Sequence, residues 1–362
     1  MTVPKILITN ANGKTGFAAA LQLLAKGYPV RAFVRTRRAS TTQLEQAGAD
    51  IFVGNMADMA TLTQAMQGIE RAYLCLPGLP NPLFSGVSFA VAAQAAKLEV
   101  VVMMGQWLSH PQHPSFATRV INLMDSILSW MPDVGVVNIN PGWFADNYMA
   151  ILEPIAQLGL MPMPLGQGLN PPPSNEDIAR VVVGALINPA PHIGKTYRPT
   201  GPKLLSPEEI ANTFAQVLNR PVKYIDISEK MFLKALRVQG FSTFLQAQMR
   251  HYAEEYRRNA FGVGGPTKAV LEVGGQPPEA FETIVQRYVD NSSVVQRSLP
   301  HQFQAVKNLV QILLTPVTDI DGYERRHHFP RIGQPTYALD DNDWLTKHGL
   351  AGDFRFTNAN AC

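Results

Sequence analysis

The chain has 362 residues, a formal net charge of +3 and a charged fraction of 16%. This length allows one main domain plus a smaller one, and the mild, scattered positive charge does not favour nucleic acid as a partner. A strand pattern follows the first residues directly, and no apolar stretch is long enough to cross a bilayer. With only two cysteines, Cys75 and Cys362, we expect a soluble cytoplasmic protein with no signal peptide and no membrane association.

The first 140 residues alternate short apolar strands with helical patterns. The strands are apolar along their whole length, which indicates burial on both faces and therefore a parallel sheet between helices. We expect an α/β, Rossmann-type doubly wound fold, in which ligands bind at the carboxyl ends of the strands. The expected strands are Lys5–Thr9, Val30–Val34, Ile51–Val53, Ala72–Leu76, Val100–Met104 and Gly135–Ile139, and the expected helices include Lys14–Lys26, Ala60–Gln67 and Val87–Lys97.

Beyond Pro141 the sequence changes character. A Pro- and Gly-rich stretch predicts a long loop that ends in a helix capped by Ser174 or Asn175, and Ser206 with Glu209 forms a capping box for a later helix. We expect a smaller, mostly helical C-terminal lobe, followed by one amphipathic helix and then polar, irregular sequence. The predicted units are a Rossmann domain over 1–150 completed by a strand near 195–200, a lobe over 151–290 and an extension over 291–362.

The stretch ILITNANGKTG, residues 6–16, joins the first strand to a helix through a GxxGxxG turn with Asn10 at the first glycine position. The first position often needs positive φ, the second lets backbone approach a pyrophosphate, and the third lets the helix pack closely. Gly13 and Gly16 meet the last two demands, and asparagine tolerates positive φ. The helix start near Lys14 would direct free N–H groups at phosphate. Taken alone, the turn fits a dinucleotide site or a purely structural role equally well.

The second strand ends in VRAFVRTRRAS, residues 30–40. Enzymes that use the unphosphorylated cofactor usually carry Asp or Glu here, which binds the ribose 2′-hydroxyl and repels a 2′-phosphate. Arg35, Arg37 and Arg38 stand here instead, with no acid nearby. Because guanidinium groups bind phosphate bidentately, the sequence favours NADP(H) over a merely solvated basic loop.

The order and spacing of several segments resemble the NmrA-like branch of the atypical short-chain dehydrogenases. These segments are ILITNANGKTG, VRAFVR, GNMADMATLTQAMQGIERAYLCLP, NINPGWFADNY, NEDIARVVVGAL, YRPTGPKLLSPEEIA and GGPTKAVLEVGGQPPEAFE, which together span roughly residues 3–290. The resemblance implies a Rossmann domain, a smaller substrate lobe, a cleft between them and NADP(H) as cofactor. The cofactor-binding residues that it implies, together with the turn described above, are Asn10, Asn12, Gly13, Lys14, Thr15, Gly16, Arg35, Arg38, Asn55, Met56, Leu76, Pro77 and Gln106.

The usual catalytic pair of short-chain reductases is absent. A Tyr-x-x-x-Lys pair normally stands on the helix after the fifth strand, whereas SFATRVINLMDSILSW contains neither residue and only Arg119 as a base. The candidate proton donors are Tyr148 and His110, with His113 as a further one, although the sequence favours packing or local hydrogen bonding as the role of each. The adjacent pair His327-His328 lacks a third ligand at suitable spacing, so no metal site is expected.

The leading hypothesis is an NADPH-dependent reductase of a small or medium, largely apolar organic substrate such as an activated C=C bond, an imine, a carbonyl or a quinone. Hydride delivery to such acceptors needs mainly positioning. The runner-up is a non-catalytic NADP(H) sensor that binds protein partners, and a weaker alternative is a cofactor-independent isomerase or lyase. The amphipathic helix His301–Leu314 would dock on the lobe or on a second copy of the chain, which allows a homodimer.

Overall fold

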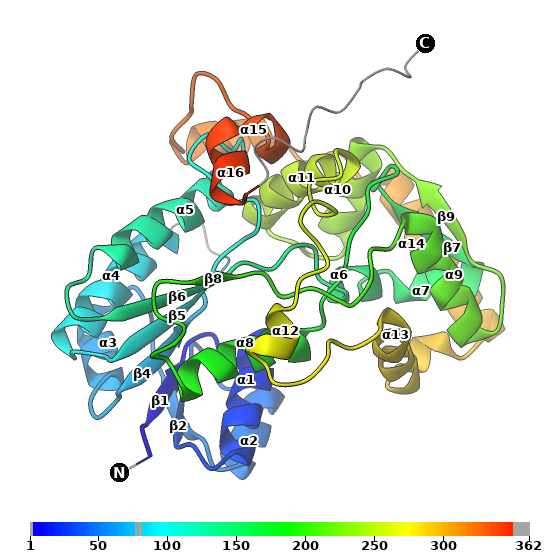
Figure 1. Cartoon of the computed structure of the whole chain (residues 1–362). Coiled ribbons are helices and arrows are strands. Elements are labelled where there is room, and N and C mark those ends of the chain that lie inside the picture. Colours follow the sequence, from blue (N-terminus) through cyan, green and yellow to red (C-terminus); the bar gives the residue numbers. More distant parts are fainter. Residues whose placement is uncertain (1–2, 77, 79–81, 350–362) are drawn as a thin grey trace.

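The computed structural model describes residues 3–76, 78 and 82–349. Seven parallel strands form one sheet in the order β3-β2-β1-β4-β5-β6-β8, with helices on both of its faces (Figure 1). This arrangement confirms the predicted doubly wound α/β fold. The strands are β1 (Ile6–Ile8), β2 (Val30–Val34), β3 (Asp50–Val53), β4 (Arg71–Leu74), β5 (Val100–Met104), β6 (Gly135–Ile139) and β8 (Thr196–Tyr197).

Both faces of the sheet are buried, as the continuous apolar strands predict. In β5, Val100 and Val102 belong to the core beneath α1 and α8, while Val101 and Met103 belong to the opposite core beneath α3, α4 and α5. Alternate side chains of one strand therefore serve two cores. The helices are α1 (Lys14–Ala25), α2 (Ala39–Gln46) and α8 (Asn175–Ile187) on one face, and α3 (Met59–Ala65), α4 (Pro82–Ala95) and α5 (Phe116–Ser129) on the other.

The strand order reverses between β1 and β4, so the connections after these two strands run to opposite faces of the sheet. In open α/β sheets such a switch point leaves a crevice at the carboxyl ends of the strands. The strand β8 lies beside β6, with Asn138 opposite Thr196, at the place where the sequence predicts an additional strand near 195–200.

The lobe contains a small sheet that the sequence analysis did not anticipate. The segment predicted as a long loop begins with β7 (Leu160–Met163), which pairs in parallel with β9 (Lys223–Asp226). Their pairing joins segments far apart in the chain, so local patterns do not reveal it. The helices of the lobe are α6 (Asp146–Met149), α7 (Leu152–Leu158), α9 (Pro207–Leu218), α10 (Glu229–Val238), α11 (Thr243–Arg257), α12 (Ala269–Glu272) and α13 (Phe281–Asp290).

The helix α14 (Leu299–Leu314), which follows a short 3-10 turn η1 (Ser293–Val295), packs on α7 and α10, so docking on the lobe is confirmed. The outer face of α14 exposes a row of apolar side chains. These residues are Leu299, Phe303, Val306, Val310, Leu313 and Val317, the last just beyond the helix.

Within the described ranges, no helix combines the length and apolar character needed to cross a membrane.

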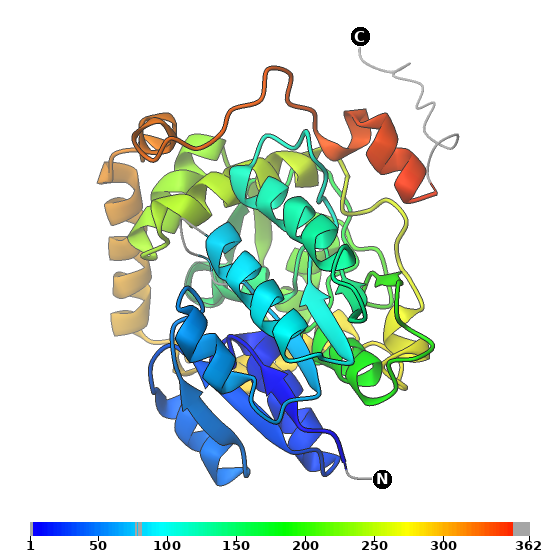
Figure 2. The same cartoon turned by 90° about the vertical axis from the view of Figure 1, so that its left-hand side faces the viewer.

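The expectation of irregular sequence after α14 was wrong. The chain continues into α15 (Ile320–Arg326), a 3-10 turn η2 (Ala338–Asp340) and α16 (Asn342–Lys347), and it crosses one end of the molecule (Figure 2). Trp344 is buried, and its indole N–H donates to the Trp107 carbonyl at 3.0 Å. Such short helices have weak sequence signals, and packing on the rest of the protein stabilises them.

Candidate nucleotide site

The turn between β1 and α1 has the conformation that its sequence predicts. Asn10 adopts a φ of 50°, in the left-handed region. A Cβ at Gly16 would lie 2.6 Å from the backbone oxygen of Asn10, and one at Gly13 would lie 3.1 Å from the same atom. Both positions therefore need glycine, because the helix starts directly against the turn.

The start of α1 offers backbone N–H groups to a ligand. Gly13 is the N-cap residue and supplies no side-chain acceptor, so the first amides of the helix keep their donors free for an anion. The Asn12 side chain forms hydrogen bonds within the protein instead. Its Nδ2 donates to the Thr36 carbonyl at 2.8 Å, and its Oδ1 accepts from the hydroxyls of Ser40 and Thr41. Asn12 thereby fixes the turn to the loop after β2.

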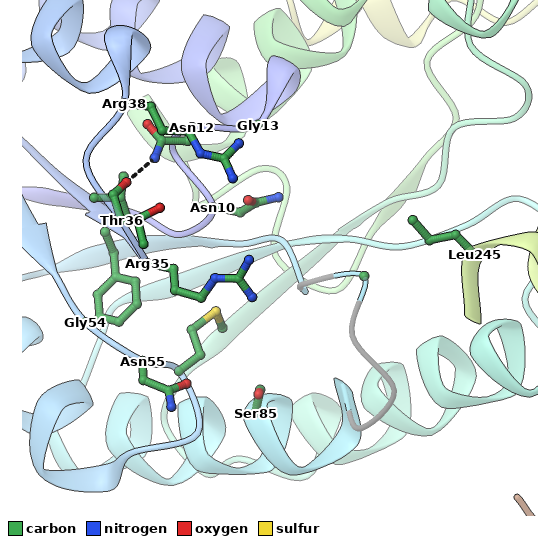
Figure 3. Close-up of a pocket in the computed structure, with 14 residues that line it drawn as sticks. Asn10, Asn12, Gly13, Arg35, Thr36, Arg38, Gly54, Asn55, Ser85 and Leu245 are labelled. Atoms are coloured by element: carbon green, nitrogen blue, oxygen red, sulfur yellow. Dashed lines mark hydrogen bonds between the residues drawn. The ribbon is translucent and has the colours of Figure 1, made fainter. Parts of the chain in front are cut away.

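A pocket of about 310 Å³ lies at the carboxyl ends of β1 and β2. It is bounded by the glycine turn, by the arginine-rich loop after β2 and by the residues that follow β3 (Figure 3). None of its described lining residues is acidic. They are Asn10, Asn12, Gly13, Phe33, Val34, Arg35, Thr36, Arg38, Gly54, Asn55, Met56, Gly78, Ser85 and Leu245.

The three arginines after β2 have different surroundings. Arg35 and Arg38 line the pocket, their guanidinium groups point into it (Figure 3), and neither forms an ion pair with any residue that the structure describes. Arg37 instead pairs with Glu45 of α2 at 3.0 Å, away from the pocket. The pocket thus presents two exposed cations and no carboxylate, which suits an anionic group such as a phosphate monoester.

Seven of the thirteen predicted cofactor residues line this pocket, and the others lie around it. The Lys14 ammonium bonds to the Asp146 carboxylate of α6 at 2.6 Å, and the Thr15 hydroxyl donates to Asn175 of α8 at 2.9 Å. These two side chains hold α1 in place, so only their backbone amides are free for a ligand. Gly16 lies inside the turn, Leu76 and Gln106 are half-buried just after β4 and β5, and Pro77 is outside the described residues.

The two predicted catalytic residues do not line the pocket. Tyr148 is fully buried, and its hydroxyl lies 2.8 Å from that of Tyr256 and accepts from Asn170 at 3.0 Å. Burial also raises the pKa of Tyr148 far above its usual range. His110 is buried beneath the C-terminal segment, together with His113. These surroundings favour structural roles for both predicted proton donors.

Several lining residues escaped the sequence analysis. Phe33 and Thr36 flank Arg35 at the end of β2, so their place could have been inferred from the strand itself. Ser85 comes from α4 and Leu245 from α11, and no local pattern marks either residue. Leu245 shows that the lobe contributes to the far end of the pocket.

The comparisons agree with this geometry. Residues 11–134 match a family described as NAD(P)H-binding. The NAD(P)H azoreductase of Xenophilus azovorans is 26% identical over 293 residues, which cover 76% of this chain and 95% of that protein. The structure of the quinone oxidoreductase QOR2 from Escherichia coli, complexed with NADPH, covers 78% of this chain and 99% of its own, at 22% identity and a TM-score of 0.66. NmrA, a negative transcriptional regulator solved in complex with NADP, covers 79% and 95%, at 14% identity and a TM-score of 0.65.

The fold and the pocket together define a dinucleotide-binding protein of the Rossmann class. More particularly, the chain contains an NAD(P)H-binding domain, and it shares the fold of NmrA and of related reductases. The resemblance inferred from the sequence is thereby confirmed for the fold and for the NAD(P)H-binding domain.

Proposed function

We propose that this protein is an NADPH-dependent reductase of a small or medium, largely apolar organic substrate. The observation that carries the proposal is the pair Arg35 and Arg38, two guanidinium groups without acidic partners in the described part of the chain, beside the glycine turn of an NAD(P)H-binding domain. Two cations at the end of β2 favour the cofactor that bears a 2′-phosphate.

In this proposal, different residues bind different parts of the cofactor. The amides at the start of α1 bind the pyrophosphate, Arg35 and Arg38 bind the 2′-phosphate, and Asn55 and Met56 flank the adenine. The described residues Leu76 and Gln106, after β4 and β5, line the nicotinamide side. When bound, the cofactor supplies the hydride, and the chain's own part is to orient it and to exclude water.

The substrate class follows from what the chain lacks and from its relatives. The segment of α5 has no Tyr-x-x-x-Lys pair, and the Arg119 guanidinium already donates to the carbonyls of His113, Pro114 and Pro330. Without the usual Tyr-x-x-x-Lys pair, the proton comes from solvent or another side chain, and acceptors whose reduction depends mainly on hydride delivery are favoured. The azoreductase and the quinone oxidoreductase among the similar proteins reduce acceptors that fit this demand.

Calorimetric titration with NADPH, NADP⁺ and NADH tests the cofactor site. Loss of a charge-assisted contact costs about 1.5–3 kcal/mol, so we expect Arg35→Ala and Arg38→Ala to weaken NADPH binding by about 10- to 100-fold and to leave NADH binding unchanged. Arg37→Ala is the matched control, because Arg37 pairs with Glu45 outside the pocket. Equal affinity of the wild type for NADPH and NADH would refute the assignment.

A non-catalytic NADP(H) sensor is the second candidate, favoured by the missing Tyr-x-x-x-Lys pair and by the fold shared with NmrA. NADPH consumption with azo dyes, quinones and enones separates the two. A reductase oxidises NADPH with at least one of these acceptors, whereas a sensor binds the cofactor and oxidises it with none. Absence of any dinucleotide binding would instead favour a cofactor-independent isomerase or lyase.

A further inference from the structure

A cluster of ionisable side chains lies beneath the C-terminal segment, outside the nucleotide pocket. His110 and His113 come from the loop after β5, Glu255 comes from α11, and Asp341 directly precedes α16. The first three are at least 98% buried, and one potential ligand atom of each lies within 4.8 Å of the others. The cluster therefore joins the Rossmann domain, the lobe and the extension at one point.

Two contacts in this cluster are long for N–H···O hydrogen bonds. Nε2 of His113 lies 3.3 Å from Oε1 of Glu255, and Nδ1 of His110 lies 3.4 Å from Oδ2 of Asp341. Both nitrogens of His110, Nε2 of His113 and Oε2 of Glu255 are buried without a hydrogen-bond partner among the described residues. Neighbouring ligands around a tetrahedral Zn²⁺ lie about 3.4 Å apart, given bonds of about 2.1 Å. Each of His110, His113 and Glu255 thus has at least one buried polar atom without a partner, and a shared ion would satisfy one atom from each.

The ion pairs of the described residues also favour a bound cation. No lysine or arginine of the described residues forms an ion pair with Glu255 or Asp341. A buried carboxylate without a cation is costly, and a divalent ion would offset that cost.

We propose that His110, His113 and Glu255 bind a divalent transition-metal ion of the Zn²⁺ type. Two imidazoles and a carboxylate are a ligand set typical of zinc. Asp341, which faces Nδ1 of His110, orients that ring so that Nε2 binds the ion. Oε1 of Glu255 accepts the amide of Ala338 at 2.7 Å, so the ion would also fix the C-terminal segment to the core.

One contact of His113 must change when a metal binds. The Ser115 amide donates to Nδ1 of His113 at 3.0 Å, which places the proton of the neutral ring on Nε2. A metal at Nε2 requires this proton to move to Nδ1, so the contact with the Ser115 amide must break.

The test uses the full-length protein, stripped of metal and titrated with Co²⁺ and then with Zn²⁺. We expect one equivalent of Co²⁺ to produce the visible absorption of tetrahedral cobalt and Zn²⁺ to abolish it by displacement. Glu255→Gln keeps the shape of the side chain and should weaken binding at least tenfold. His328→Ala is the control, because this histidine is exposed and outside the cluster.

Two results would overturn the proposal: wild-type protein that gives no tetrahedral cobalt absorption, or Glu255→Gln that binds as tightly as the wild type. Circular dichroism checks that the variant is folded. Should Glu255→Gln fail to fold, His110→Asn carries the same expectation, and the wild-type titration decides by itself. None of these readouts depends on reductase activity, so they stand apart from the proposed function.

Discussion

The arginine pocket and the histidine cluster are built in opposite ways. Most of the pocket comes from one continuous stretch, residues 10–56, whose strands and turns bring its side chains to one sheet edge. The cluster draws its members from the loop after β5, from α11 and from the C-terminal segment. Arg35 and Arg38 of the pocket are exposed, whereas His110, His113 and Glu255 of the cluster are buried and contain polar atoms without hydrogen-bond partners. A site made from neighbouring elements can be recognised in a sequence, while one made by distant segments cannot.

The relatives sharpen this contrast. The azoreductase alignment covers 95% of that protein but only 76% of this chain, so roughly a quarter of the chain has no counterpart there. If the arginine pocket and the histidine cluster are independent, a substitution that disrupts one of them should leave the other unchanged.

Trp344→Ala should give the largest effect, because it removes a buried indole that packs on Trp107 with ring centroids 5.2 Å apart. We expect a loss of about 3 kcal/mol in the free energy of unfolding, measured with urea. NADPH affinity should stay within about twofold of the wild type, because distant sites are nearly additive. Trp130→Ala, at a 77% exposed tryptophan, is the control and should change little. A large loss of NADPH affinity in Trp344→Ala would show that the two regions are coupled.

Glu255→Gln should change how stability depends on pH. The pKa of Glu255 in the folded protein is raised to about 7 by burial, above its unfolded value, so folding takes up a proton between these values. Stability from this group is therefore present at acid pH and is lost as the pH rises toward 7. The free energy of unfolding is measured with urea at pH 5 and pH 8 in the presence of a chelator. From pH 5 to pH 8, the free energy of unfolding of Glu255→Gln should rise relative to that of the wild type by on the order of 2 kcal/mol. Glu208→Gln, at an exposed carboxyl, should follow the wild type at both values.

Asn10→Ala tests the turn of the pocket. Asn10 has a φ of 50°, where alanine costs about 1 kcal/mol more than glycine. We expect Asn10→Ala to lower the midpoint of thermal unfolding and to weaken NADPH binding, while Asn10→Gly keeps both close to wild type. Equal behaviour of the two variants would mean that the backbone conformation at this position is not what the pocket requires.

Phe303→Asp should have the smallest effect on stability, within about 0.5 kcal/mol, because this side chain is exposed on α14. Its apolar neighbours recur at the three- and four-residue spacing of a helix-pairing face. If the chain forms the predicted homodimer through this face, sedimentation should show Phe303→Asp shifted toward monomer, with Gln304→Glu on the exposed polar side unchanged. A wild type that is monomeric at all concentrations would remove the prediction.

Much of the Rossmann fold could be predicted from the sequence. The spans of β2, β5 and β6 agree with the expected ones, because strands buried on both faces are continuous apolar runs. Helix caps were equally informative: Ser174 accepts the amide of Asp177, and Ser206 with Glu209 forms the expected box. Tyr148, by contrast, follows β6 in the sequence, where ligand-binding residues are expected. Its side chain is nevertheless buried in the core of the lobe.

The sequence by itself determined the parallel sheet, the glycine turn and the arginines that meet it, because each depends on local periodicity, backbone preference and charge within a few consecutive elements. Only the tertiary structure decided that β7 pairs with β9, that α15 and α16 cover one end of the molecule, and that His110, His113 and Glu255 meet. These features depend on contacts between distant segments, whose free energy is gained only when the whole chain folds.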